Sequence, residues 1–320
     1  MTTSSSALNF NATSGLPRHI RFGSSTWTYP GWKGLIYHRD YKSEREFKAK
    51  SLGEYVECPL FRTVGIDSAF YTPPTEELLG RYAALLPPSF QWVEKVWERL
   101  TIPKYPTHPR YGSERGKANP DFLNPELFKT AVLAPHDAPA VLPHVGPFVF
   151  QFPTIHTAVM GPDEFVERLH KFLLQLPPQF RYATEVRNPE YLTSRYFQAL
   201  NESGATHCFN HWHIMPPLVE QMKQAALAGG LKAPFYVARI LTPLGVNYAG
   251  AVKMFEPYDR VKQPSPEMRR DVVRLARRAI ERNADAFIIV NNRCEGNSPG
   301  TIAAIGEMLS QAPSSLDKEE

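Results

Sequence analysis

The stretch 182-YATEVRNPEYLTSRYFQALNE-202 has the pattern of one short strand followed at once by one helix. Residues 182–187 form the strand-like run. Pro189 stands at the predicted start of the helix, where a missing amide N–H costs nothing. The same pattern occurs eight times along the chain. The predicted strands are residues 20–27, 62–71, 90–97, 145–152, 182–187, 206–212, 235–241 and 286–292. The predicted helices are residues 44–56, 75–85, 125–133, 162–176, 189–202, 217–227, 265–282 and 298–309.

Strands that alternate with helices indicate a parallel sheet. Eight such units favour a closed barrel over an open doubly wound sheet, and no GxGxxG follows the first strand to support a dinucleotide-binding fold. We therefore predict an α/β protein, a single-domain (β/α)8 TIM barrel over residues 19–310. Residues 1–18, rich in Ser, Thr and Asn, are predicted to be a disordered N-terminal tail, and residues 311–320 a flexible C-terminal tail.

Charge and composition argue against several classes of partner. The 36 basic and 32 acidic side chains leave a net charge of only +4. The dense arginine run at 269–282 lies on a predicted helix with an apolar opposite face, which is typical of a solvated outer surface and argues against a nucleic-acid partner. The sequence has no run of 18 apolar residues, so we predict no membrane span. Three scattered cysteines without a CxxC favour a reducing, cytoplasmic compartment. The oligomeric state is not indicated.

Polar residues cluster at the predicted carboxyl ends of the strands. Barrel strands are buried on both faces, so polar residues there are informative exceptions. In barrel enzymes the carboxyl-terminal mouth is where the active site lies. As catalytic residues we predict Asp67, Lys95, Glu185 and Arg187. As substrate-binding residues at strand ends we add Gln151, Arg239, Asn291 and Asn292.

Two of these assignments have structural alternatives. Glu185 and Arg187 share one face of their strand by the period of two, so they form either a brace at the mouth or a tuned catalytic pair. Lys95 is either a charge partner of Asp67 or Glu94, or, if desolvated, an amine that forms a Schiff base.

Aromatic residues and a long loop are predicted to shape the mouth. Trp27, Tyr29, Trp32 and Tyr71 are expected to form an apolar wall. The connection 101–124 leaves the third strand and should overhang the mouth, as long loops of functional sites do.

The segment 291-NNRCEGNSPGT-301 joins the last strand to the last helix. Helix N-termini after the late strands of barrels often bind phosphate. We predict an anion site at the backbone of residues 297–300, with Arg239 adding charge and Glu295 and Asn297 assigned to binding. The alternative is an ordinary helix cap without a ligand.

The sequence has only weak signatures of metal or carbohydrate chemistry. His207, His211 and His213 could converge with Asp67 and Glu185 as metal ligands, but no HExxH motif is present and Arg and Asn dominate the mouth. The pair Asp67 and Glu185 is the only candidate for two glycosidase carboxylates. We predict neither a metal nor a cofactor.

Together the motifs resemble the DUF72 (YecE-like) family. The resemblance rests on GSSTWTYPGWKGLIY at 23–37, DSAFYTPP at 67–74, FVFQFP at 148–153, EVRN at 185–188 and NNRCEGNSPGTI at 291–302, and on Lys95. A family Thr-His element matches Thr107 and His108, so His108 joins the predicted binding residues. Asp67-Ser68, the sixth strand and the seventh strand depart from the family pattern. The resemblance implies a barrel and no particular reaction.

The leading hypothesis is an enzyme that performs metal-independent acid–base chemistry on a small anionic substrate, phosphorylated or carbohydrate-like. The alternatives are a non-catalytic small-molecule binding protein that uses the same mouth, and a metal-dependent nucleic-acid phosphodiesterase. Fold does not choose among these, because barrels host many chemistries.

Overall fold

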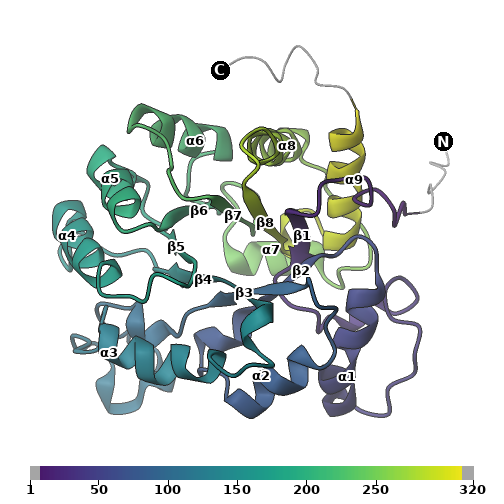
Figure 1. Cartoon of the computed structure of the whole chain (residues 1–320), viewed down its shortest axis with the longest axis horizontal. Coiled ribbons are helices and arrows are strands. Elements are labelled where there is room, and N and C mark those ends of the chain that lie inside the picture. The colour runs from purple at the N-terminus through teal and green to yellow at the C-terminus, as the bar shows by residue number, and fades with distance from the viewer. Residues whose placement is uncertain (1–7, 312–320) are drawn as a thin grey trace.

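Eight parallel strands form one sheet at the centre of the molecule, in the order β1-β8-β7-β6-β5-β4-β3-β2 (Figure 1). The computed structural model describes residues 8–311. The strands are β1 Ile20–Ser24, β2 Thr63–Ile66, β3 Gln91–Lys95, β4 Val145–Gln151, β5 Tyr182–Glu185, β6 Thr206–His211, β7 Phe235–Ile240 and β8 Asp285–Val290. Each begins within one residue of its prediction and ends one to five residues early. The prediction of eight parallel strands is confirmed.

The barrel closes almost completely. β1 pairs with β8 over its whole length, from Ile20 opposite Ala286 to Ser24 opposite Val290. On its other side β1 meets β2 through a close backbone approach, in which the Arg62 N–H donates to the Phe22 carbonyl at 2.8 Å. A Cβ at Gly23 would lie 1.9 Å from the Thr63 carbonyl oxygen. Only glycine fits that position, so this residue permits the two ends of the sheet to meet.

Helices surround the strands, and all of them except α7 cover the outer faces of the sheet (Figure 1). They are α1 Glu44–Glu57, α2 Glu76–Ala83, α3 Pro125–Leu127 with a π-helical continuation Phe128–Leu133, α4 Pro162–Leu173, α5 Ser194–Glu202, α6 Leu218–Leu227, α7 Tyr248–Phe255, α8 Pro266–Glu281 and α9 Ser298–Ser310. The eight predicted helices are present. α7 is an addition in the connection between β7 and α8, and Asn247 caps it by accepting from the Gly250 N–H at 2.9 Å. Within residues 8–311 no helix has the length and apolar character needed to cross a membrane.

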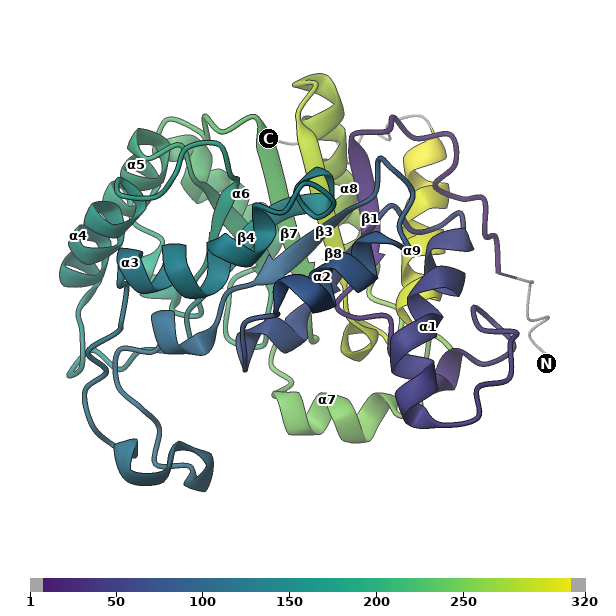
Figure 2. The ribbon, with the colours of Figure 1, turned by 60° about the horizontal axis from the view of Figure 1, so that its bottom comes forward.

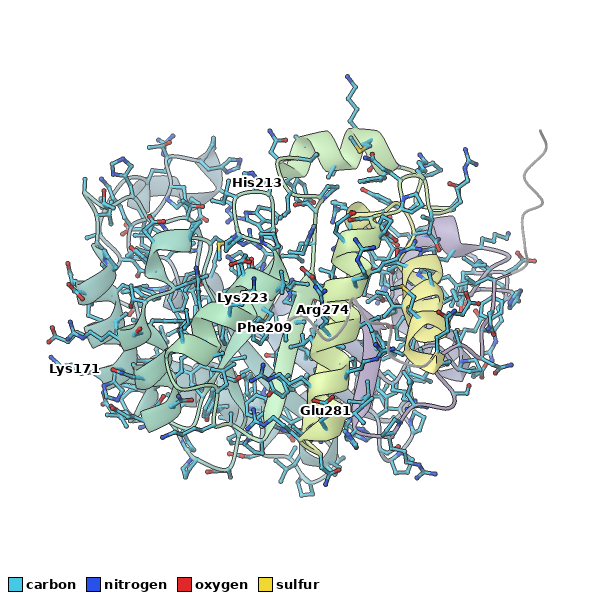
Figure 3. The ribbon with its side chains drawn as sticks, turned by 90° about the horizontal axis from the view of Figure 1, so that it is seen from above. Lys171, Phe209, His213, Lys223, Arg274 and Glu281 are labelled. Carbon is cyan, nitrogen blue, oxygen red and sulfur yellow. The ribbon has the colours of Figure 1, made fainter. Side chains whose placement is uncertain are left out.

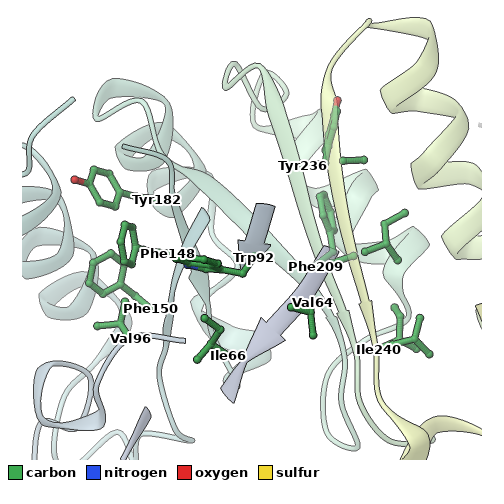
Figure 4. Packing of buried hydrophobic residues seen from close by; sticks show 14 of the residues in the cluster. Val64, Ile66, Trp92, Val96, Phe148, Phe150, Tyr182, Phe209, Tyr236 and Ile240 are labelled. Atoms are coloured by element: carbon green, nitrogen blue, oxygen red, sulfur yellow. The ribbon is translucent and has the colours of Figure 1, made fainter. Parts of the chain in front are cut away.

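The strands alternate between two separate cores. Phe148, Phe150 and Tyr182 face outward and pack with one another between sheet and helices (Figure 4). The inward positions form a second cluster inside the barrel, which includes Val149 and Val237. This alternation is the period of two expected for a strand buried on both faces.

A polar cluster fills the amino-terminal end of the barrel, below the interior apolar layer. Arg21 and Arg181 both bind the Asp285 carboxylate, at 2.5 Å and 2.9 Å. Arg181 also donates to the Gln91 side chain at 2.9 Å. Because this end is occupied by paired charges, the open end of the barrel is the carboxyl-terminal one.

The N-terminal segment departs from the prediction of a disordered tail. Ala12 and Thr13 are buried, and the Thr13 hydroxyl donates to the Leu60 carbonyl at 3.3 Å. Arg62 donates to four backbone carbonyls of residues 13–17. Residues 8–18 therefore pack against the barrel, because a guanidinium binds their free carbonyl groups. Residues 1–7 and 312–320 lie outside the described residues.

Candidate functional site

A cleft of about 930 Å³ lies at the carboxyl ends of the strands. This is within the range of small-molecule sites. Its wall comes from strand ends, from the predicted overhanging connection after β3 and from α7 through Tyr248. Figure 2 shows α7 beyond one end of the strands. Figure 3 shows His213, which follows β6, close to α7, with Glu281 at the other end of the barrel.

The polar floor of the cleft follows directly from the strand period. Each of five strands carries an apolar interior residue, and the polar residue two positions later stands on the same face, one layer nearer the mouth. The apolar residues are Val93, Val149, Ala183, Val237 and Ile289. The polar residues are Lys95, Gln151, Glu185, Arg239 and Asn291. Residues far apart in the sequence thus form one polar layer above an apolar one.

Arg239 is the centre of this layer. Its guanidinium binds both Asp67 carboxylate oxygens, at 2.8 and 2.9 Å, and the Glu185 carboxylate at 2.5 Å. Arg187 binds the other oxygen of Glu185 at 3.1 Å and lies over the Trp212 ring, 3.9 Å from its centroid. The structural alternative for Glu185 and Arg187, a brace at the mouth, is therefore what the geometry shows.

Glu185 is poorly suited to act as a general base. Its side chain is fully buried. Burial alone would raise its pKa, but Arg239 and Arg187 outweigh that effect and lower the pKa to about 2. A carboxylate with such a low pKa stays ionised near neutral pH and does not accept a proton. Its role is to hold two guanidinium groups in place. Asp67 keeps 32% of its side chain exposed to the cleft.

Lys95 differs from the other cations in this layer. Its ammonium lies 3.6 Å from the centroid of the Phe70 ring. Within residues 8–311 it has no hydrogen bond or ion pair. Burial lowers its pKa to about 7, and the neighbouring guanidiniums of Arg239 and Arg187 act in the same direction. Glu94 is not its partner, because Glu94 points to the opposite face and pairs with His136 at 2.8 Å.

Arg293 is a cleft residue that was not predicted from the sequence. It lies over the rings of Tyr248 and Tyr258, at 4.5 and 5.7 Å. Its polar partner is the Asn291 side-chain oxygen at 3.2 Å, and no carboxylate of the described chain pairs with it. Asn291 in turn donates to Ser25 at 3.1 Å. Arg293 stood within the quoted segment 291–301, but nothing in that pattern says which side chain turns towards the mouth.

The rim is aromatic and partly basic. Tyr29 lines the cleft between Trp32 and Tyr258, with ring centroids 4.9 and 5.9 Å away. Tyr71 is 61% exposed. Arg110, from the connection after β3, lies 5.2 Å over the Tyr71 ring and pairs with Glu98. The connection after β3 lines the cleft, as expected for a loop that overhangs the mouth.

Six of the predicted binding residues do not line the cleft, and the first three are two tryptophans and a histidine. Trp27 is buried and packs edge-on against Tyr82 at 4.9 Å. Trp32 is fully buried beneath Tyr29 and stacks near Phe61 at 6.2 Å. Both tryptophans belong to the core, because the segment after β1 turns them inward. His108 is exposed, caps the turn that starts at Pro109, and does not line the cleft.

The predicted anion site at the last helix is corrected by the structure. Asn297 caps α9 by accepting from the Gly300 N–H at 2.8 Å, and the Asn292 side chain accepts from the Ser298 N–H at 2.8 Å. Glu295 is fully buried and pairs with Arg269 at 2.7 Å. None of these three predicted residues lines the cleft. The first turn of α9 is satisfied internally, and Arg239 is bound to carboxylates.

The histidines considered as metal ligands do not converge. The two nitrogens of His207 contact Tyr196 and Gln221, at 3.0 Å each. His211 contacts the Thr242 carbonyl at 2.7 Å. Across the described part of the chain, no three His, Cys, Asp or Glu side chains are grouped as a metal site would require.

Comparison with known proteins places the chain in a family. Residues 21–320 match the family described as "Protein of unknown function DUF72". The chain belongs to the DUF72 family. A DUF72 family protein from Enterococcus faecalis is 17% identical, with a TM-score of 0.57 over 92% of this chain and 98% of that one. Another from Thermotoga maritima is 16% identical, with a TM-score of 0.56 over 91% and 99%. At this identity the likeness supports the DUF72 barrel fold alone, and no curated protein matches the sequence.

Proposed function

We propose that the protein is an enzyme that binds a small anionic substrate in the cleft and acts on it by side-chain acid–base chemistry. The observation that carries the proposal is a surplus of positive charge. Three cations that line the cleft, Lys95, Arg293 and the exposed Lys104 of the rim, have no carboxylate partner among residues 8–311. The carboxylates Asp67 and Glu185 are already bound to arginines. An anionic ligand would supply the missing partner.

Arg293 is the proposed anchor. Its guanidinium rests on tyrosine rings, which hold its plane while leaving donors along its edge. The side chain of Arg293 lines the cleft. A carboxylate or phosphate oxygen is the acceptor best suited to a guanidinium edge.

Lys95 is the proposed proton-transfer group. With a pKa of about 7 it is present in both protonation states near neutral pH, which suits a general acid or base. Glu185 is excluded from that role by its burial and by its low pKa of about 2. It positions Arg187 and Arg239 instead.

Titration calorimetry with inorganic phosphate and with small carboxylates tests the binding step. The Arg293→Met variant keeps the bulk of the side chain and removes its charge. Losing a charge-assisted pair should weaken anion binding by about 10-fold or more. The matched control is Arg278→Met, because Arg278 is exposed on α8 and away from the cleft.

Equal affinity in both variants would contradict the anchor role of Arg293. Absence of any saturable anion binding by the unmodified protein would contradict the proposed substrate class.

A further inference from the structure

Lys95 ends β3 and packs against an aromatic ring. A cation that only anchors an anion would not require such a ring. Its ammonium faces the Phe70 ring at 3.6 Å and lacks a hydrogen-bond acceptor within residues 8–311. Phe70 belongs to the turn Asp67–Phe70, which directly follows β2. The adjacent β2 and β3 therefore place an aromatic face against an amine at the floor of the cleft.

The cations around Lys95 already provide fixed charge. Arginine side chains stay protonated in proteins, and both Arg187 and Arg239 are paired with carboxylates. A lysine among them adds little to charge recognition, but it is the one member of this group of three that can lose its proton. A neutral amine in a partly desolvated pocket is a nucleophile towards carbonyl carbon. Burial lowers the pKa of Lys95 to about 7, so the amine is available near neutral pH.

We infer that Lys95 captures the carbonyl carbon of a small aldehyde or ketone that carries a carboxylate or phosphate group, and holds it as an iminium. This inference rests on the anion binding of the proposed function and names the substrate class of the same cleft. It gives the Lys95 amine a covalent role in place of proton transfer. The negative group of the substrate would bind Arg293, and the carbonyl would meet Lys95.

The step balances without an external oxidant or reductant. The neutral Lys95 amine attacks the carbonyl carbon, a C–N bond forms, and one proton passes from the nitrogen to the former carbonyl oxygen to give a neutral carbinolamine. The proton that the ammonium released on becoming the amine then protonates the hydroxyl group, which leaves as water while the nitrogen lone pair forms the C=N bond. Overall, one ammonium and one carbonyl compound give one protonated iminium and one water.

The surroundings suit the product as well as the amine. A protonated iminium is a cation like the ammonium it replaces, so it can keep the same place over the Phe70 ring. The Asp67 side chain is partly exposed to the cleft, and its carboxylate places a negative charge near the iminium.

Hydride trapping tests the inference directly. The full-length protein is incubated with pyruvate, glyoxylate or glyceraldehyde 3-phosphate and then treated with sodium borohydride, and peptides are mapped by mass spectrometry. The expected result is a secondary-amine adduct concentrated on the Lys95 peptide. Lys95→Arg, which preserves the charge, should abolish it. Lys104→Arg, at an exposed lysine of the cleft rim, should leave it unchanged.

A second variant tests the role of the ring. Phe70→Leu retains an apolar side chain but removes the aromatic face, and should reduce adduct yield about 3- to 30-fold. Adduct spread evenly over exposed lysines, or undiminished in Lys95→Arg, would overturn the inference. Equal trapping of neutral acetone would overturn the anionic part of the substrate class.

Phosphate binding measured on the same sample separates this inference from the proposed function. No adduct together with saturable phosphate binding overturns the iminium and leaves the anion site standing. No adduct and no phosphate binding overturns both.

Discussion

Replacing Glu185 by glutamine tests what the buried charge cluster contributes to stability. Glu185 is fully buried and bridges two guanidiniums, with Arg239 at 2.5 Å and Arg187 at 3.1 Å. Glutamine keeps the size of the side chain, removes its charge and turns an NH2 donor towards groups that are themselves donors. The substitution therefore leaves buried cations poorly compensated.

The magnitude follows from the pKa of Glu185. A folded-state pKa of about 2, against an ordinary value of 4.5, corresponds to about 3 kcal/mol of stability at neutral pH. Breaking a buried ion pair by removing one partner costs a similar amount, about 3–5 kcal/mol. Because the folded-state pKa lies below the unfolded one, this stability is fully present above pH 4.5. It is lost as the pH falls from 4.5 towards about 2.

Thermal unfolding measured at several pH values tests this figure. At pH 7 the Glu185→Gln variant should unfold about 5 °C below the unmodified protein. The gap should narrow as the pH falls below about 4.5, since the unmodified protein then loses the same contribution. The control is Glu77→Gln, which removes an exposed carboxylate that pairs with Arg81 at 3.1 Å. A loss no larger than that of the control, or a gap independent of pH, would refute the reasoning.

Three further variants address single features. Lys95→Met should raise the unfolding temperature at pH 6, because the lowered pKa of Lys95 means that its protonated form costs folding free energy, and the gain should shrink towards pH 10; a destabilised variant would contradict this. Trp32→Ala should lower the free energy of unfolding in urea by about 3–5 kcal/mol, as for a fully buried tryptophan, and a near-neutral effect would return Trp32 to the cleft wall. Arg269→Met should cost about 3 kcal/mol by orphaning buried Glu295, with phosphate affinity unchanged in calorimetry; weaker binding would show that the pair reaches the cleft after all.

The fold could be predicted from the sequence because the same local pattern repeats along the chain. Eight strand-like runs, each followed by a helix, leave a barrel as the arrangement that buries both faces of every strand. The period of two also assigned faces correctly. Gln151 turns to the mouth while Phe148 and Phe150 pack outward, as their alternation requires. These inferences succeed because they depend on neighbours in the chain.

Local pattern failed where a side chain had two plausible environments. Trp27 and Trp32 follow β1 and were expected in the wall, yet the connection turns them into the core while Tyr29 faces the cleft. The segment after β8 has the residues of an anion site, but its amides are bound by Asn292 and Asn297. Side chains that cap a helix and amides that await a ligand have the same sequence signature.

The sequence by itself determined the barrel, the end at which the candidate cleft lies and most of the charged residues there, because strand period and chain direction place them. Only the tertiary structure decided the pairing among them. Asp67 directly follows β2, while Glu185 and Arg239 lie in β5 and β7. These three strands are not neighbours in the sheet, and the side chains meet across the barrel interior. Which cations are bound and which stay open to a ligand depends on those distances between strands, and no pattern along the chain encodes them.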